Sequence, residues 1–530
     1  MELAKARRPW AGLYSFFKVL LAATLGELAV FTALIIAHAA LSYSSLEFLA
    51  GFLGLAVTMS AVIALCSGAA YVYFAIPKYR LPLIFCILLT GSTLGAHLYV
   101  INNPSLPACV DTSKGVNGCV MDESYYVPSA EDFYNGTQCG PGIANCNPEH
   151  PFLSKALMAA GIWAFGDNTT GWRIFDVLLG SFSLPLLFLI TLRLTGSRKA
   201  SYLSAALLGL DVMFFSQSSA ALLDIPLVFF SLLAFVLYLY KVRLWLLDRF
   251  TLAGICLGLA TLSKETGIFL IATLATYHFL VGEGGRTYRS LTSIELALVS
   301  VGVFILGLQT YDSLLARAAF PTFLSQIQYM LHYGASLIGG GWTYGNNIQI
   351  TPFSWVTYYQ PVTYFGSTVI VNNVVNGTVV GILYTYPDVT YYGVTNFIET
   401  WTVYLWVPLA AVAMWAVFKP KPPGLDRFGF ADNSPREFSG DTKMAVLSLV
   451  WLCWNYLPYV ALYLAGRVTY PFYFVPALPA VAMGGSYFLT RSWVPKFAVV
   501  LYLVGAFVFF FWFFPSKAFL PVWLRVLIGK

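Results

Sequence analysis

Apolar runs long enough to cross a membrane recur along the whole 530-residue chain, and they constrain its fold more than any other feature. A membrane-spanning helix needs about 20 predominantly apolar residues. Thirteen spans are predicted, at 12–43, 47–76, 81–101, 171–194, 200–216, 222–240, 251–263, 266–282, 291–312, 401–418, 444–464, 469–489 and 497–515. Only 10% of the residues are charged, against about a quarter in a soluble protein. The sequence therefore predicts an all-α polytopic membrane protein and excludes a soluble enzyme, a nucleic-acid-binding protein and a disordered scaffold.

The basic residues predict how the spans are oriented, because Lys and Arg are enriched in cytoplasmic loops. With the N-terminus placed inside, 20 of the 30 basic residues fall on the inner side and nine on the outer side. The C-terminus is then expected outside, and the two longest loops, 102–170 and 313–400, are expected to be extracytoplasmic.

Cysteines and glycosylation sequons agree with this orientation. The first long loop contains four close cysteines, Cys109, Cys119, Cys139 and Cys146. Such spacing suggests two disulfides in an oxidising compartment. Three pairings are possible, and we favour the local one, Cys109–Cys119 with Cys139–Cys146. The three N-x-[ST] sequons, at Asn135, Asn168 and Asn376, also fall on the outer side.

The two long loops divide the chain into five regions. These are the N-terminal spans 1–101, the first loop 102–170, the transmembrane core 171–312, the second loop 313–400 and the C-terminal spans 401–530. The segments 152–165 and 321–337 are expected to form helices that lie on the outer leaflet. Short strands are expected after the second of these helices. This arrangement suits a site where a lipid headgroup meets a water-borne acceptor.

An adjacent pair of carboxylates, Asp122 and Glu123, is the sharpest local feature of the first loop, and Tyr125 and Tyr126 follow it closely. One carboxylate can take a proton from a hydroxyl while its neighbour orients it. The alternative is a solvated acidic loop, because other acidic residues lie nearby.

Four basic side chains on the outer side are candidates for binding a phosphate: Lys155, Arg173, Lys264 and Arg467. Lys155 and His150 lie at the start of the first interfacial helix, where Lys155 has an alternative role as an anchor at the membrane surface.

Lys264 falls between the two short spans, at a predicted helix break, where a charge suggests function. A local ion pair with Glu265 is the alternative. Asp224, near the outer end of its span, is expected to pair with a cation, in a structural role more than a catalytic one. No metal-binding or dinucleotide-binding motif is present in the sequence.

Several motifs occur in an order that resembles a known family. After the acidic pair come HPFLSKALMAAGIWAFGDNTTGWR, LGLDVMFFSQSSAALLDIPLVFFSLLAF, AGICLGLATLSKETGIFL, ITPFSWVTYYQPVTYF and GRVTYPFYFVPALPA. Over about 120–490, the chain is similar to the dolichyl-phosphate-mannose–protein mannosyltransferases, which belong to the C-type (GT-C) membrane glycosyltransferases. More loosely, it is similar to the lipid A aminoarabinose transferases.

The resemblance implies transfer of a sugar, mannose in this family, from a polyprenyl or dolichyl monophosphate to a hydroxyl of protein Ser or Thr. It implies inversion at the sugar carbon, with Asp122 as general base and Glu123 as a residue that binds the acceptor or positions the base. It implies no required cofactor, and divalent-metal dependence stays open. Expected partners are the lipid-linked donor, the hydroxyl acceptor and membrane lipids, with no nucleic acid and with the oligomeric state open.

One position departs from the family pattern. The family often has Arg where this chain has Ser219, in QSSAALLD, so another cation must replace it. The alternatives to protein mannosylation are transfer to a lipid or glycan acceptor, an oligosaccharyltransferase subunit, and a flippase for lipid-linked sugars. The expected location is the plasma membrane of an archaeon or other prokaryote, with the endoplasmic reticulum as the alternative and the active site extracytoplasmic.

Overall fold

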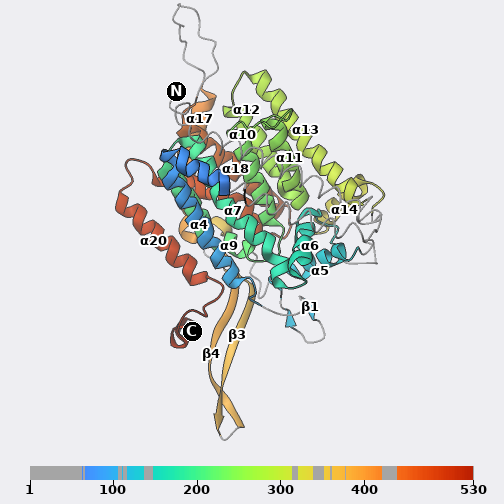
Figure 1. Ribbon diagram of the computed structural model, residues 1–530, viewed down its shortest axis with the longest axis vertical. Coiled ribbons are helices and arrows are strands. Elements are labelled where there is room, and N and C mark those ends of the chain that lie inside the picture. Colours follow the sequence, from blue (N-terminus) through green and yellow to red (C-terminus); the bar gives the residue numbers. More distant parts are fainter. Residues whose placement is uncertain are drawn as a thin grey trace, which may run out of the picture.

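The computed structural model describes residues 63, 66–104, 110–111, 116–117, 119–136, 147–312, 320–337, 351–357, 361–375, 378–419 and 438–528. Helices dominate these residues, and two antiparallel strand pairs accompany them (Figure 1). The N-terminal half contains η1 (Pro77–Tyr79), α4 (Arg80–Val100), β1 (Val110–Asp111), β2 (Val116–Asn117), α5 (Glu123–Tyr134), α6 (Leu153–Phe165), α7 (Thr169–Thr195), α8 (Arg198–Leu210), α9 (Val212–Ser218), α10 (Asp224–Leu239) and α11 (Arg249–Ser263). The remainder contains η2 (Glu265–Gly267), α12 (Ile268–Val281), α13 (Arg286–Thr310), α14 (Phe323–Ser336), α15 (Ser354–Thr357), β3 (Val362–Val375), β4 (Thr378–Gly393), α16 (Phe397–Thr400), α17 (Val403–Phe418), α18 (Gly440–Leu464), η4 (Pro471–Ala477), α19 (Leu478–Leu489), α20 (Lys496–Phe513) and α21 (Val522–Ile528).

The prediction of a polytopic helical membrane protein is confirmed. Seven helical segments among the described residues are long and apolar enough to cross a membrane, and four shorter apolar helices accompany them. Each predicted span from 81–101 onward coincides with a helical segment. The predicted spans 12–43 and 47–76 lie wholly or largely outside the described residues, so the count of thirteen stays a prediction.

Polar residues interrupt two of the predicted spans. The span 200–216 breaks at Asp211, whose carboxylate caps α9 by accepting the amide of Phe214 (2.8 Å). Lys264 has an extended backbone (φ −153°, ψ 137°) and separates α11 from the short turn η2, as the sequence predicts. Both breaks bring ionisable side chains to helix ends, where backbone groups are free to bind them.

The transmembrane core is built from facing helices with large aromatic residues between them. Phe235 of α10 stacks on Trp451 of α18, with ring centroids 4.5 Å apart. Trp406 of α17 is fully buried and packs against Gly484 of α19, where a Cβ atom would fall about 2.2 Å from the indole ring. This close packing gives a rigid frame for the loops above it.

The second long loop forms a larger β-structure than expected. β3 and β4 contain 14 and 16 residues and pair as one long antiparallel hairpin that projects from the helical body (Figure 1). The expectation of short strands is therefore wrong. The two expected interfacial segments are helical, as α6 and α14.

Candidate active site

The two adjacent carboxylates lie at a sharp turn that begins α5. Met121 has a positive φ of 56°, which is uncommon for a residue other than glycine, and its amide donates to the carbonyl of Tyr364 in β3 (3.3 Å). Asp122 is the N-cap residue, with no capping hydrogen bond from its side chain, and Glu123 is the first residue of the helix. Because the chain turns here, the neighbouring side chains have different surroundings: Asp122 lines a cavity, and Glu123 is fully buried.

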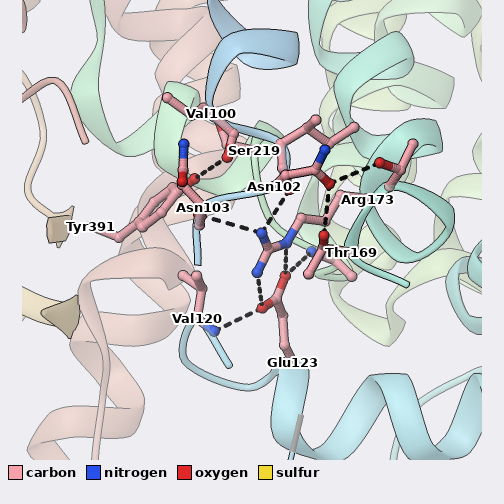
Figure 2. A network of polar contacts seen from close by, with 12 residues as sticks. Val100, Asn102, Asn103, Val120, Glu123, Thr169, Arg173, Ser219 and Tyr391 are labelled. Atoms are coloured by element: carbon pink, nitrogen blue, oxygen red, sulfur yellow. Dashed lines mark hydrogen bonds and ion pairs between the residues drawn. The ribbon is translucent and has the colours of Figure 1, made fainter. Parts of the chain in front are cut away.

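Glu123 is held by four hydrogen bonds, shown in Figure 2. Arg173 of α7 donates from Nε to Oε1 (2.7 Å) and from Nη2 to Oε2 (2.8 Å). The amides of Val120 and Ala221 each donate at 2.7 Å to the same carboxylate. Both charged side chains have no exposed area. A bidentate pair of this kind fixes orientation as well as charge.

Glu123 and Arg173 balance each other's charge, so neither side chain needs a ligand as its partner. Arg173 also donates from Nη1 to the carbonyl of Ile101, at the end of α4 (2.8 Å). The two residues thus connect α4, α5 and α7. This geometry favours the positioning alternative for Glu123, and a positioning role for Arg173 in place of the expected phosphate binding.

A cavity of about 970 Å³ opens beside Asp122. Its volume is at the upper end of the range for ligand sites. One part of its lining is polar or charged and includes Asp122, His150, Lys264, Glu265 and Arg467. Another part is apolar and includes Ile268, Ile271, Val301, Phe304, Ile327 and Leu331. The cavity can therefore accept an amphipathic molecule.

Asp122 is in a position to act as a base. Tyr126 Oη lies 3.5 Å from Asp122 Oδ2. Burial raises the pKa of Asp122, and the nearby Lys264 and His150 partly oppose this shift. A carboxylate with a raised pKa binds a proton more readily than an exposed aspartate does.

Lys264 lies on the cavity wall but has a partner. It donates to both oxygens of Asp224 (2.9 and 2.8 Å), and its Nζ lies 4.9 Å from the ring centroid of Phe472. The expected pairing of Asp224 with a cation is confirmed. Glu265, the alternative partner of Lys264, instead accepts from His150 (2.9 Å) if the imidazole carries its proton on Nδ1.

Lys155 supports the segment that carries His150. Its Nζ donates to the carbonyls of Asn147 (2.6 Å) and His150 (2.9 Å). Lys155 is buried, and burial lowers its pKa to about 7. It does not appear in the lining of the cavity. The geometry thus favours a role in positioning His150.

Arg467 is the predicted cation that is best placed for a ligand. It lines the cavity, and it forms no ion pair with any of the described residues. Its Nε is buried and has no hydrogen-bond partner among them. A guanidinium in this state suits a phosphate oxygen, which would supply both charge and acceptors.

Several cavity residues were not singled out from the sequence. Tyr470 and Tyr473 belong to a quoted motif, GRVTYPFYF, but their motif gave no separate reason to place them at the site. Tyr333 comes from α14 and Tyr364 from β3, and both also line the cavity. Of the predicted pair, Tyr126 is buried, whereas the side chain of Tyr125 is 55% exposed.

The described residues include one of the four loop cysteines and the asparagines of two of the three glycosylation sequons. Cys119 is disulfide-bonded, but Cys109, Cys139 and Cys146 lie outside the described residues, as does Asn376. Asn135 is exposed at the end of α5. Asn168 caps α7, and its amide nitrogen donates to the carbonyl of Phe165 (2.8 Å).

Comparison with known proteins gives matches in both sequence and structure. Residues 148–305 match the family described as dolichyl-phosphate-mannose-protein mannosyltransferase. A polyprenol-phosphate-mannose–protein mannosyltransferase of Corynebacterium glutamicum is 33% identical over 96 residues, which are 17% of this chain and 18% of that protein. An uncharacterized protein of Aquifex aeolicus is 28% identical over 199 residues, 36% of this chain and 39% of that protein. The chain thus matches less than half the length of these two relatives.

A solved structure supports the fold. The S. cerevisiae protein O-mannosyltransferase Pmt1-Pmt2 complex, bound to the sugar donor, matches with a TM-score of 0.57 at 12% identity, over 84% of this chain and 90% of that chain. The chain therefore shares the fold of that protein. The resemblance to the dolichyl-phosphate-mannose-protein mannosyltransferase family is confirmed by the match over residues 148–305.

Proposed function

We propose that the protein transfers a sugar, mannose by its family resemblance, from a polyprenyl monophosphate to a protein hydroxyl on the extracytoplasmic side of the membrane. The observation that carries this proposal is the composition of one cavity. Asp122, Lys264 and Arg467, which forms no ion pair with the described residues, share it with many apolar side chains. A polyprenyl-phospho-sugar has the matching parts: an apolar chain, a phosphate and a sugar carbon open to attack.

The reaction is a single displacement. Asp122 takes the proton of the acceptor hydroxyl as its oxygen bonds to the anomeric carbon. The bond from that carbon to the phosphate oxygen breaks, and polyprenyl phosphate leaves with the electron pair. Arg467 stabilises the leaving phosphate, with Lys264 nearby, because cations aimed at developing charge lower the barrier. Attack opposite the leaving group inverts the anomeric centre.

Two substitutions test Asp122 as the base and Arg467 as the phosphate contact. Purified protein in lipid nanodiscs is supplied with a polyprenyl-phospho-mannose and a threonine peptide, and glycopeptide is measured by mass spectrometry. Because a general base contributes about 10²–10⁴-fold, Asp122→Asn should lower kcat by that order. Arg467→Met should raise the KM for the lipid donor and leave the melting temperature unchanged, because no ion pair within the described residues is lost.

Asp132→Asn is the matched control. It makes the same chemical change near the other end of α5, at a residue that does not line the cavity. If Asp122→Asn turned over at the wild-type rate, Asp122 would not be the general base. Sugar transfer to lipid or glycan in place of peptide would show that the acceptor class is wrong.

A further inference from the structure

The two edges of the β3–β4 hairpin are covered differently. At the base of β4, the amide of Thr390 donates to the carbonyl of Pro515 (2.9 Å), and Val389 pairs with Ser516. The C-terminal helix α21 also contacts β4. The sheet has only these two strands in the part of the chain that the structure describes. Within these described residues, no third strand lies beside the outer edge of β3.

The base of β3 lies at the cavity, and among the described residues its outer edge is open beyond Tyr364. Val362 and Tyr364 line the cavity, and the carbonyl of Tyr364 accepts the amide of Met121. Met121 directly precedes Asp122. The outward-facing backbone of β3 is thus already bonded to the backbone beside the proposed base. From this point β3 leads away from the helical body along the projecting hairpin (Figure 1).

The sequence of β3 does not protect this edge. Natural edge strands are commonly blocked by charged residues or proline, since open backbone groups pair readily with another chain. β3 contains neither, whereas β4 carries Pro387 and Asp388. The 14 residues of β3 rise by about 3.4 Å each, so the edge is long enough to pair with many residues of an extended chain.

We propose that the open edge of β3 binds the acceptor as an extended polypeptide strand and leads its hydroxyl residue to Asp122. This inference rests on the proposed transfer to a protein hydroxyl. Main-chain hydrogen bonds to a sheet edge provide affinity that depends little on sequence. The acceptor must be unfolded locally, because its backbone has to be free to pair. Val362 and Tyr364 then form the point where the acceptor strand enters the cavity.

The test removes the outer part of the hairpin and keeps its base. Residues 370–385 are excised, and Val369 is joined to Tyr386 through Asn-Gly, a pair that favours a two-residue hairpin turn. The contacts of Tyr364 and Val389 are retained. Two acceptors are compared, a long unstructured polypeptide with a single Thr and a blocked threonine tripeptide. Because several hydrogen bonds would be lost, the KM for the long acceptor should rise by at least about tenfold, with kcat and tripeptide transfer unchanged.

Binding of the long polypeptide is measured separately by fluorescence anisotropy, with no donor present. If the wild type binds the polypeptide and transfers no sugar, the proposed function is wrong, whereas polypeptide binding at the edge of β3 is supported. If the wild type transfers sugar, and the shortened protein keeps the wild-type KM and affinity for the long polypeptide, the acceptor does not bind at the edge of β3. A change from dimer to monomer on shortening, without loss of peptide affinity, would show that the edge joins two copies of this chain.

A second pair of variants keeps the proposal testable if the shortened protein does not fold. Ile370 and Val371 are consecutive residues in regular register with Thr385 and Tyr384. In an antiparallel pair, one of two neighbouring amides points to the partner strand and the other points outward. Of Ile370→Pro and Val371→Pro, only the variant that loses the outward amide should weaken binding of the long polypeptide without lowering the melting temperature. Equal affinity in both variants and the wild type would contradict the proposal.

Discussion

At the scale of single residues, two neighbouring carboxylates are separated by their surroundings. Glu123 is bound on all sides by Arg173 and backbone amides, whereas Asp122 faces the cavity with Tyr126 beside it. The oxygens of Glu123 are occupied by these hydrogen bonds, whereas Asp122 is open to the cavity and burial raises its pKa. Of the two, Asp122 is therefore the one suited to proton transfer.

This difference predicts the pH dependence of transfer. Asp122 acts as a base only when deprotonated, and its pKa is raised, so kcat/KM should fall with decreasing pH at a higher pH than for an ordinary aspartate. The hydrogen bond from Tyr126 lowers this pKa. Tyr126→Phe should accordingly move the acidic limb of the kcat/KM profile to higher pH. An unchanged limb in Tyr126→Phe would mean that another group sets the pH dependence.

At the scale of elements, the buried ion pair fixes α5 to α7. Removing one partner of a buried pair leaves the other charge unsolvated, at a cost of about 3–5 kcal/mol. Glu123→Gln should therefore lower the free energy of unfolding by that order, measured by thermal unfolding in detergent. The double variant Glu123→Gln with Arg173→Leu should regain part of the loss, since no buried charge remains.

The exposed pair of Arg491 and Asp441 provides the control for this prediction. Asp441 is 58% exposed in that pair, and exposed ion pairs contribute at most about 1 kcal/mol. Asp441→Asn should therefore change stability little. If Glu123→Gln were as mild as Asp441→Asn, the anchoring role of the buried pair would be contradicted.

Local sequence predicted the helices well and the pairing of their charges less well. A long apolar run, or a charge such as Lys264 between two runs, specifies a span or a break without distant information. The partner of Glu123 is 50 positions away, and the partner of Lys264 is 40 positions away. Which cation meets which carboxylate depends on how the helices pack, so Arg173 and Lys155 were expected in the ligand site and are instead engaged elsewhere.

At the scale of the whole molecule, segments distant in sequence form the cavity together. α5, the α11–α12 junction, α14, β3 and the segment 467–473 all contribute to its lining. The sequence located the long loops that hold several of these parts, because the loops interrupt the apolar runs. It did not predict the length of the hairpin, since Thr and Val alone do not specify how many residues remain paired.

The strand contact made by Pro515 and Ser516 has a consequence for the solution behaviour of the protein. Pro515, Ser516 and α21 cover the second edge of the hairpin at its base. A chain ending at Phe513 would therefore present unpaired backbone groups on both edges. Ribbons of that kind polymerise edge to edge. We expect the shortened protein to form large assemblies by light scattering while it still modifies the tripeptide. Monodisperse particles would contradict this expectation, and the C-terminal segment would then have no part in keeping the protein dispersed.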